Sequence, residues 1–200
     1  LAVVRLRRAR RFAKALGATL GAALLAACTG AAACGLEDPS SIPMRRGALN
    51  LAFPESLRVG TAVWQAELDG RLPRDPLAQR GDLAPEVRAA MRQMRTNTVL
   101  RRFAAQMAAP GTAAPPDFAV VLLGPVMLTR FEAGDGKVNP ILHVEGPEQG
   151  DVVLVTDLAA VDAITRGSLT FAAALDLGVM RLYGSPAGVA AARDWIIAKA

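Results

Sequence analysis

The sequence predicts an α+β domain, and two observations support this prediction. First, runs rich in Val, Leu, Ile and Phe follow one another between residues 118 and 155 with no helical segment between them. Second, segments with apolar residues at helical spacing lie before and after these runs. Consecutive strands tend to pair with each other, and helices separated from them along the chain are typical of α+β proteins. We therefore expect an antiparallel sheet of about five strands, covered by helices and preceded by a helical N-terminal segment.

The composition excludes several classes of protein. The chain has 200 residues, of which 52% are hydrophobic and 20% charged, and this balance excludes a disordered chain. No apolar run reaches 18 residues, so the sequence does not predict a membrane-spanning helix. One histidine and two cysteines cannot form a tetrahedral metal site. Gly134-Asp135-Gly136-Lys137 is a turn sequence rather than a phosphate-binding loop, and we expect neither metal nor cofactor.

The first 27 residues have the pattern of a lipoprotein signal peptide. Six of the 23 basic residues lie within the first fourteen positions, and an apolar stretch over residues 15–25 follows them. The stretch ends in Leu25-Ala26-Ala27-Cys28, which resembles the lipobox of bacterial lipoproteins. The resemblance implies cleavage before Cys28, a diacylglyceryl thioether on its sulfur and an acyl chain on its new amine. The alternative is an ordinary signal peptide cut at an Ala-x-Ala site, with Cys28 incidental.

Three further features concern the export of this lipoprotein. Arg10-Arg11-Phe12 is close to the twin-arginine signal but lacks the usual residue before the Phe, so both export routes stay open. Thr29, rather than Asp, follows Cys28, and by analogy with lipoprotein sorting in enteric bacteria this favours the periplasm-facing side of the outer membrane. We interpret Cys34 as a spare thiol, with an intermolecular disulfide as the alternative.

The positive charge belongs to the export signal. Removing the six leader residues from the 23 Lys and Arg leaves 17 against 18 Asp and Glu, so the remainder carries a net charge of −1. A nucleic-acid-binding protein would show a basic excess. We therefore predict no nucleic-acid partner.

Residues 28–110 precede the predicted sheet. Residues 28–54 are rich in Gly, Ala, Ser and Pro and have no periodicity, which predicts a flexible tether. The single α+β domain then extends over residues 55–200, with a helical part at 55–110. Its first helix is expected at 56–68, where Trp64 is interpreted as a core anchor or, alternatively, as a ligand-stacking side chain. A second helix is expected from Asp82 to Ala108, with one apolar side formed by Val87, Ala90, Met91, Met94, Val99, Phe103 and Met107.

Arginines occupy the other side of the second predicted helix: Arg88, Arg92, Arg95, Arg101 and Arg102. The plainer interpretation is a solvated helix surface. The alternative is a docking face for anionic lipid headgroups or an acidic partner, and its candidate residues are Arg88, Arg92, Arg95 and Arg102.

The predicted sheet lies in residues 117–200. Strands are expected at 118–123, 126–131, 141–144, 152–155 and 179–183. Helices are expected to begin near Asp157, Thr170 and Pro186, and the first of them to end at Gly167. The sequence Ala133-Gly134-Asp135-Gly136 predicts a hairpin turn.

Residues 151–184, DVVLVTDLAAVDAITRGSLTFAAALDLGVMRLYG, resemble the C-terminal half of the sterol carrier protein 2 (SCP-2) family. The matching residues are Gly167, Leu169, Ala172, Ala173, Ala174, Gly178, Leu182 and Gly184. The resemblance implies a sheet covered by helices, with an apolar cavity for a lipid or fatty-acyl ligand. Candidates to line it are Phe118, Met127, Leu142, Phe171, Leu175 and Met180, each of which is alternatively an ordinary core residue.

His143 is the only histidine and the best candidate for catalysis. We expect it in a strand between Leu142 and Val144, on the side that faces solvent. No serine lies in a Gly-x-Ser-x-Gly elbow, which would position a nucleophile for a Ser-His-acid triad. We therefore interpret His143 as structural and expect the protein not to be an enzyme.

Two functions fit these predictions. The first is a membrane-anchored envelope lipoprotein whose SCP-2-like domain binds a lipid or fatty-acyl ligand without catalysis. The alternative is an accessory lipoprotein that docks an envelope protein complex and takes no small-molecule ligand. An apolar cavity of at least ~300 Å³, the lower end for ligand sites, would favour the first function, and a filled core would favour the second.

Overall fold

A computed structural model describes residues 41–78, 80–108 and 117–197. The chain divides into two units, Leu1–Cys34 and Gly35–Ala200, and all described residues belong to the second. The predictions for the signal peptide, Cys28, Thr29, Cys34 and the first part of the tether lie outside the described residues. Within the described ranges, no helix is long and apolar enough to cross a membrane.

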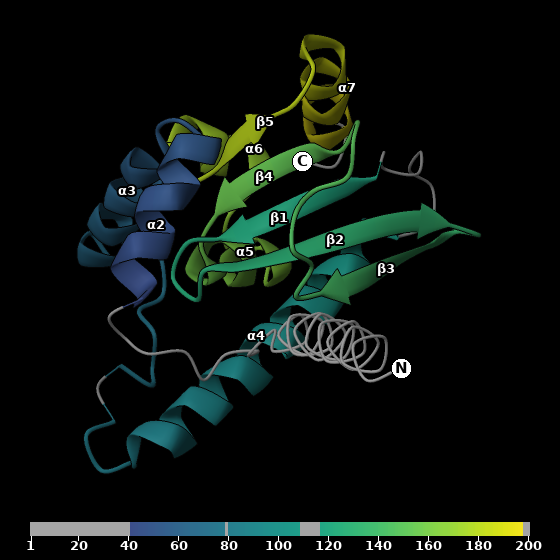
Figure 1. The fold of residues 1–200 in the computed structure, drawn as a ribbon. Helices are drawn as coiled ribbons and strands as arrows, with labels where there is room; N and C mark the ends of the chain where they lie inside the picture. Colours follow the sequence, from purple (N-terminus) through teal and green to yellow (C-terminus); the bar gives the residue numbers. More distant parts are fainter. Residues whose placement is uncertain (1–40, 79, 109–116, 198–200) are drawn as a thin grey trace, which may run out of the picture. The chain divides into compact units, whose positions relative to one another are not determined.

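Five strands form one mixed sheet (Figure 1). They are β1 (Phe118–Leu122), β2 (Met127–Gly134), β3 (Lys137–Leu142), β4 (Val152–Thr156) and β5 (Arg181–Tyr183), in the spatial order β3-β2-β1-β4-β5. Three of the four pairings are antiparallel, but β1 and β4 are parallel. The prediction of a purely antiparallel sheet is therefore wrong. After β3 the chain crosses to the free edge of β1, and a crossover connection, unlike a hairpin, produces a parallel pair.

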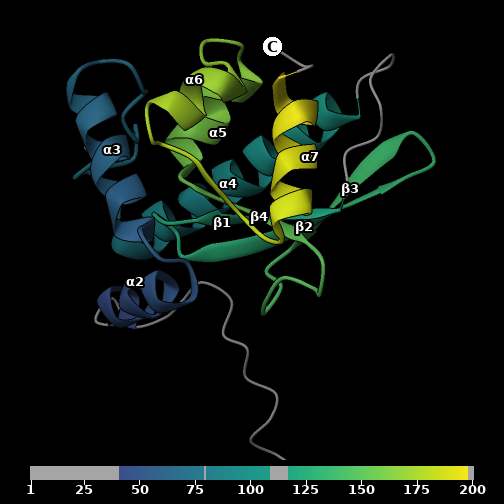
Figure 2. The same cartoon turned by 90° about the horizontal axis from the view of Figure 1, so that it is seen from above.

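The helices of the described residues are α2 (Ser41–Ala52), α3 (Ser56–Leu68), α4 (Pro85–Met107), α5 (Leu158–Thr165), α6 (Phe171–Asp176) and α7 (Pro186–Ile197). Seen from above, α4, α5 and α6 cover one face of the sheet, while α2 and α3 stand at one end of it (Figure 2). The helix predicted at 56–68 is confirmed as α3. The next helix begins at Pro85 rather than at Asp82, because proline suits the first helical turn and Ala84 takes the N-cap position.

The prediction of a flexible tether is wrong for residues 41–52, which form α2. The Arg46 side chain donates hydrogen bonds to the carbonyl oxygens of Leu123 and Gly124, at 3.2 and 3.1 Å. Leu49 and Phe53 pack against the core of the domain. These long-range contacts hold a segment whose composition alone predicts no order.

The hairpin predicted at residues 133–136 is confirmed between β2 and β3. Gly134 pairs with Lys137, so Asp135 and Gly136 form a two-residue turn. Both have positive φ, 50° and 71°, which is the backbone geometry of a type I′ turn. Glycine adopts that geometry without steric cost, which explains Gly136 in this turn.

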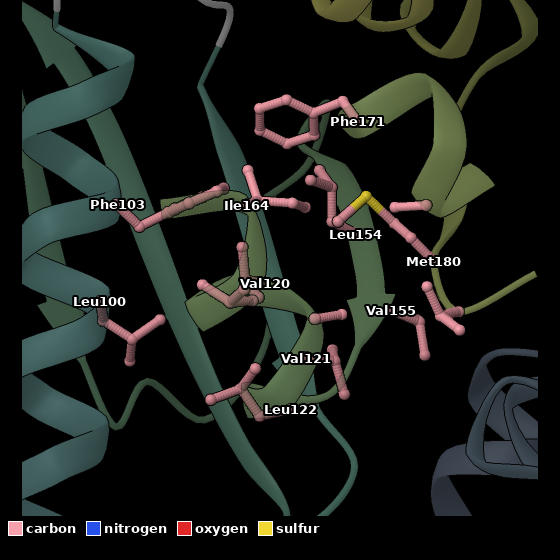
Figure 3. Close-up of a cluster of buried hydrophobic side chains, with 14 of the residues drawn as sticks. Leu100, Phe103, Val120, Val121, Leu122, Leu154, Val155, Ile164, Phe171 and Met180 are labelled. Atoms are coloured by element: carbon pink, nitrogen blue, oxygen red, sulfur yellow. The ribbon is translucent and has the colours of Figure 1, made fainter. Parts of the chain in front are cut away.

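The hydrophobic core lies between the sheet and the helices that cover it, and Phe103 of α4 points into it (Figure 3). Its ring lies 6.4, 5.6 and 5.8 Å from the rings of Phe118, Phe131 and Phe171, measured between centroids. Burying a side chain of this size stabilises a fold by about 1.5–3 kcal/mol. Other buried members of this core are Leu100, Val120, Val121, Leu122, Leu154, Val155, Ile164 and Met180.

Candidate functional site

The residues predicted to line a ligand cavity lie in or next to the core. Phe118, Met127, Phe171 and Met180 are buried, and Leu142 and Leu175 are half-buried. An apolar pocket does lie between α4, β1, β4, α6 and α7. Its lining residues are Phe103, Met107, Phe118, Leu154, Phe171, Ala192, Trp195 and Ile196. Two of the six predicted residues, Phe118 and Phe171, are among them.

This pocket is almost filled by its own side chains. Its volume is about 10 Å³. A single water molecule needs about 10–15 Å³ on this measure, whereas ligand sites begin at about 300 Å³. The surface that lines the pocket is entirely apolar. In this conformation the pocket cannot hold an acyl chain.

The C-terminal helix α7 closes the pocket from one side. Ala192, Trp195 and Ile196 of α7 face it, and Ile196 is fully buried there. The helix packs mainly against α6 and β4. An opening of the pocket would therefore require α7 to move away from these two elements.

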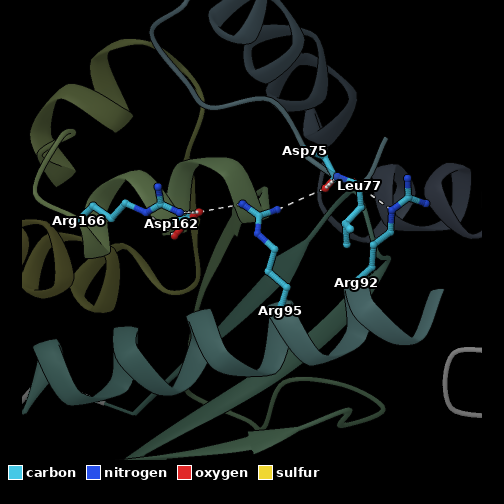
Figure 4. A network of polar contacts seen from close by, with 6 residues as sticks. All are labelled: Asp75, Leu77, Arg92, Arg95, Asp162 and Arg166. Atoms are coloured by element: carbon cyan, nitrogen blue, oxygen red, sulfur yellow. Dashed lines mark hydrogen bonds and ion pairs between the residues drawn. The ribbon is translucent and has the colours of Figure 1, made fainter. Parts of the chain in front are cut away.

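Two of the predicted docking arginines, Arg92 and Arg95, form ion pairs with other residues of the domain (Figure 4). Arg95 Nη2 lies 2.8 Å from Asp162 Oδ2 on α5, and Arg95 Nη1 lies 3.5 Å from Asp75 Oδ1. Arg92 Nε lies 3.0 Å from Asp75 Oδ2. Arg166 Nη2 completes the network at 2.7 Å from Asp162 Oδ2. The Asp162 side chain is only 3% exposed, so the arginines neutralise a buried carboxylate and join α4 to α5.

Arg88 also has a structural contact, because its Nη2 donates a hydrogen bond to the carbonyl oxygen of Leu83 at 3.0 Å. Arg101 and Arg102 are exposed. Neither forms an ion pair with another residue of the described part of the chain. Of the predicted docking arginines, Arg102 is the one with neither an ion pair nor a side-chain hydrogen bond to another described residue, and Arg101 lies beside it.

The outward side of α4 carries a row of exposed apolar side chains. Val87, Met91 and Met94 are spaced four and three residues apart, so they lie in one row, and Met94 is 69% exposed. The core-facing residues begin at Thr96 and continue through Val99 to Met107. The prediction placed both sets on one apolar side. It is wrong because Val99 lies five positions after Met94, which turns the two side chains well apart around the helix axis.

Trp64, predicted to be a core anchor, is 59% exposed. On α3 the buried residues are Val59, Val63 and Ala66, whose spacing of four and three residues defines the packed side. Leu57, Trp64 and Leu68 lie on the opposite side and are exposed. The spacing of the small apolar residues, rather than the size of the tryptophan, was the signal that identified the core side.

His143 does not lie in a strand. β3 ends at Leu142, and the positive φ of His143, 60°, turns its half-buried ring toward α4. There its Nε2 lies 2.7 Å from Nε2 of Gln93. The amide nitrogen can only donate, so the imidazole nitrogen accepts the hydrogen bond. Within the described ranges no group of His, Cys, Asp and Glu side chains could hold a metal ion.

The carboxyl ends of the parallel strands β1 and β4 meet at Gly124 and Asp157. The Gly124 amide donates a hydrogen bond to Asp157 Oδ2 at 2.7 Å. A Cβ at Gly124 would lie 2.9 Å from that oxygen, so this approach requires glycine. Burial raises the pKa of the Asp157 carboxyl, and the hydrogen bond from Gly124 partly offsets the rise. Asp157 is the N-cap residue of α5, and we interpret the pair as a structural junction.

Arg130 of β2 is a second charged junction that the sequence did not indicate. Its guanidinium binds Asp151 at 3.1 Å, Glu148 at 3.2 Å and Asp117 at 3.4 Å, and it also contacts Glu132. These carboxylates come from β2 and from the segments that precede β1 and β4. The cluster therefore holds the crossover segment against the sheet.

No model of a known protein family matches the chain, and no curated protein matches it either. The lipobox and the SCP-2 resemblance therefore stay predictions.

Proposed function

We propose that the chain is a lipid-anchored envelope protein, acylated at Cys28, which acts by docking another envelope protein rather than by catalysis. The observation that supports docking is the outward row of α4, Val87, Met91 and Met94, on the side opposite its packed residues. The small pocket under α7 supports docking over a preformed ligand site at that place, because a volume of about 10 Å³ holds no lipid.

The side chains of this row indicate what kind of protein surface would bind it. Methionine side chains adapt to surfaces of different shape, and exposed apolar patches mark interaction sites. Arg101 lies two turns beyond Met94 on the same side of α4, and Arg102 follows it. The row therefore fits a protein surface that combines an apolar groove with carboxylates near one end.

Photo-crosslinking in cells tests this function. A photoreactive amino acid in place of Met94 is expected to form one dominant protein adduct. The same amino acid in place of Asp135, on the exposed tip of the β2–β3 hairpin, is the matched control and is expected to form none. Adding Arg101→Glu and Arg102→Glu is expected to reduce the Met94 adduct several-fold. The same adducts from both positions, or none from Met94, would count against docking through α4.

Acyl-ligand binding is the second candidate, and the entirely apolar lining of the pocket under α7 favours it. The order of elements in the C-terminal part of the domain also supports this candidate. α5 is followed by Gly167 with a φ of 72°, the Ala-rich α6 comes next, and β5 lies between Gly178 and Gly184. Uptake of a ligand would require α7 to move outward and Trp195 to leave the pocket.

Native mass spectrometry tests this candidate with Cys28→Ser protein, which cannot be acylated. After delipidation and addition of palmitate, ligand binding predicts an adduct of one palmitate per chain. Trp195→Ala enlarges the pocket and is expected to raise the adduct fraction. The absence of an adduct from both proteins would refute acyl-ligand binding and leave docking as the function.

A further inference from the structure

We propose that the outward side of α3 lies on the surface of the bilayer that holds the acylated Cys28. The contact residues are Leu57, Trp64 and Leu68, here called the α3 row. This inference rests on the proposed lipid anchor, and it adds a second contact between the domain and the membrane, one that sets the orientation of the domain.

The α3 row is a continuous uncharged strip. Leu57, Thr61, Trp64 and Leu68 are spaced four, three and four residues apart, so they follow one line along the helix. All four are exposed. The opposite side of α3 is held in the core by Val59, Val63 and Ala66. The helix is therefore fixed in position with its large apolar side chains directed away from the domain.

The length of the intervening chain limits how far the start of α2 can lie from the anchor. Twelve residues separate Cys28 from Ser41, the first residue of α2, and even a fully extended chain of this length spans at most about 45 Å. α2 and α3 are in contact and stand at the same end of the sheet (Figures 1 and 2). Asn50 of α2 fixes the connection, because its Oδ1 accepts hydrogen bonds from Ser56 Oγ and the Leu57 amide, both at 3.3 Å.

The side chains of the α3 row fit the bilayer interface. Tryptophan is enriched at the level of the lipid headgroups, where its indole ring meets an apolar and a polar environment at once. Leucines on the same side of a surface helix enter the boundary of the acyl chains. The row has no charged residue, whereas the α4 row continues into Arg101. For this reason we assign the bilayer to α3 and the protein partner to α4.

Tryptophan fluorescence of the full, acylated chain in phosphatidylcholine vesicles tests the inference. The chain has two tryptophans, so Trp195→Phe leaves Trp64 as the only one, and Trp64→Phe leaves Trp195. Bromine atoms on the acyl chains quench a tryptophan that reaches them. Brominated vesicles are expected to lower Trp64 emission about twofold, as for a side chain at the acyl boundary. Trp195 emission is expected to stay nearly unchanged, because Trp195 packs against the core.

Matched substitutions identify the contact surface. In the single-Trp64 protein, Leu68→Glu is expected to abolish most of the quenching, while the Cys28 lipid keeps the protein on the vesicles. Met94→Glu on α4 introduces the same charge at another exposed apolar position and is expected to leave the quenching unchanged.

Two failures of this experiment are distinguishable. Mass spectrometry of the same sample shows whether Cys28 is acylated, and an unacylated Cys28 overturns the proposed anchor and this inference together. If Cys28 is acylated and the protein is bound to the vesicles, yet Trp64 is quenched no more than Trp195, the membrane contact of α3 alone is overturned. A Trp64 that becomes shielded only when an envelope protein is added would also overturn it and would assign the row to a protein partner.

Discussion

The guanidinium of Arg95 on α4 lies 2.8 Å from the carboxylate of Asp162 on α5. The two residues are 67 positions apart in the chain. Their contact is the reason that the arginine side of α4 is only partly a free surface. It joins the helix that precedes the sheet to the first helix after the crossover.

Arg95→Ala should destabilise the domain. Removing one partner of a buried ion pair costs 3–5 kcal/mol in general, and here we expect about 2 kcal/mol, because Arg166 still binds Asp162. Arg102→Ala, on the exposed side of α4, is the control and should change the free energy of unfolding by less than about 0.5 kcal/mol. Urea unfolding measures both values. Equal effects of the two substitutions would show that the Arg95–Asp162 contact has no structural role.

Asp157 should make stability depend on pH. Burial raises the pKa of its carboxyl in the folded protein above the ordinary value of about 3.9 in the unfolded chain. The folded state therefore holds this proton over a range where the unfolded state has lost it. The resulting stability is fully present below the unfolded pKa and is lost as the pH rises through the folded pKa.

Asp157→Asn tests this pH dependence, because asparagine does not titrate and can still accept the Gly124 hydrogen bond. The free energy of unfolding of the wild type, minus that of the variant, should fall as the pH rises from about 4 toward neutrality. Urea unfolding at a series of pH values measures the difference. A difference that does not change with pH would mean that the environment of Asp157 leaves its pKa unshifted.

Gly136→Ala should cost about 1 kcal/mol, because alanine is strained at the positive φ of the type I′ turn. Gly134 is the matched control. It lies two residues earlier in the same hairpin, and a Cβ at either glycine meets nothing within 4 Å. The φ of Gly134 is not positive, so Gly134→Ala should have almost no effect on the melting temperature. Similar losses from both substitutions would contradict the assigned turn.

Phe103→Ala should be among the most damaging single substitutions, with a loss of about 3–5 kcal/mol. Its ring is fully buried and meets three other aromatic rings. Trp64→Ala removes a larger side chain from the surface and should cost less than about 1 kcal/mol. Chemical unfolding measures the stability loss of each variant. A larger loss for Trp64→Ala than for Phe103→Ala would support Trp64 as the core anchor.

Local patterns in the sequence predicted most of the elements. The spacing in residues 56–68 predicted α3. The apolar runs after Phe118 predicted five strands, although the third is Lys137–Leu142 rather than 141–144. The Gly134-Asp135-Gly136 sequence predicted the hairpin, because a two-residue turn with positive φ depends on the residues of the turn alone. Each of these features involves residues close together along the chain.

The candidate surfaces were predicted less well, because large apolar residues were assigned to the core from their residue type alone. Trp64 and Met94 are apolar but exposed, whereas Arg95 is charged and mostly enclosed. Whether such a residue is covered depends on which side of its helix meets the sheet. Smaller apolar residues at helical spacing, such as Val59 and Val63, indicated the buried side of the helix better than the large residues did.

The sequence by itself determined most elements of this domain from α3 onward, their order along the chain and the near-neutral charge of residues 28–200. Only the tertiary structure decided that β4 pairs in parallel with β1, that α2 belongs to the domain and that α7 closes the apolar pocket to about 10 Å³. The physical reason is the range of the interactions. Turns and helical periodicity arise between near neighbours, whereas pairings such as Arg95 with Asp162 exist only after distant segments have packed together.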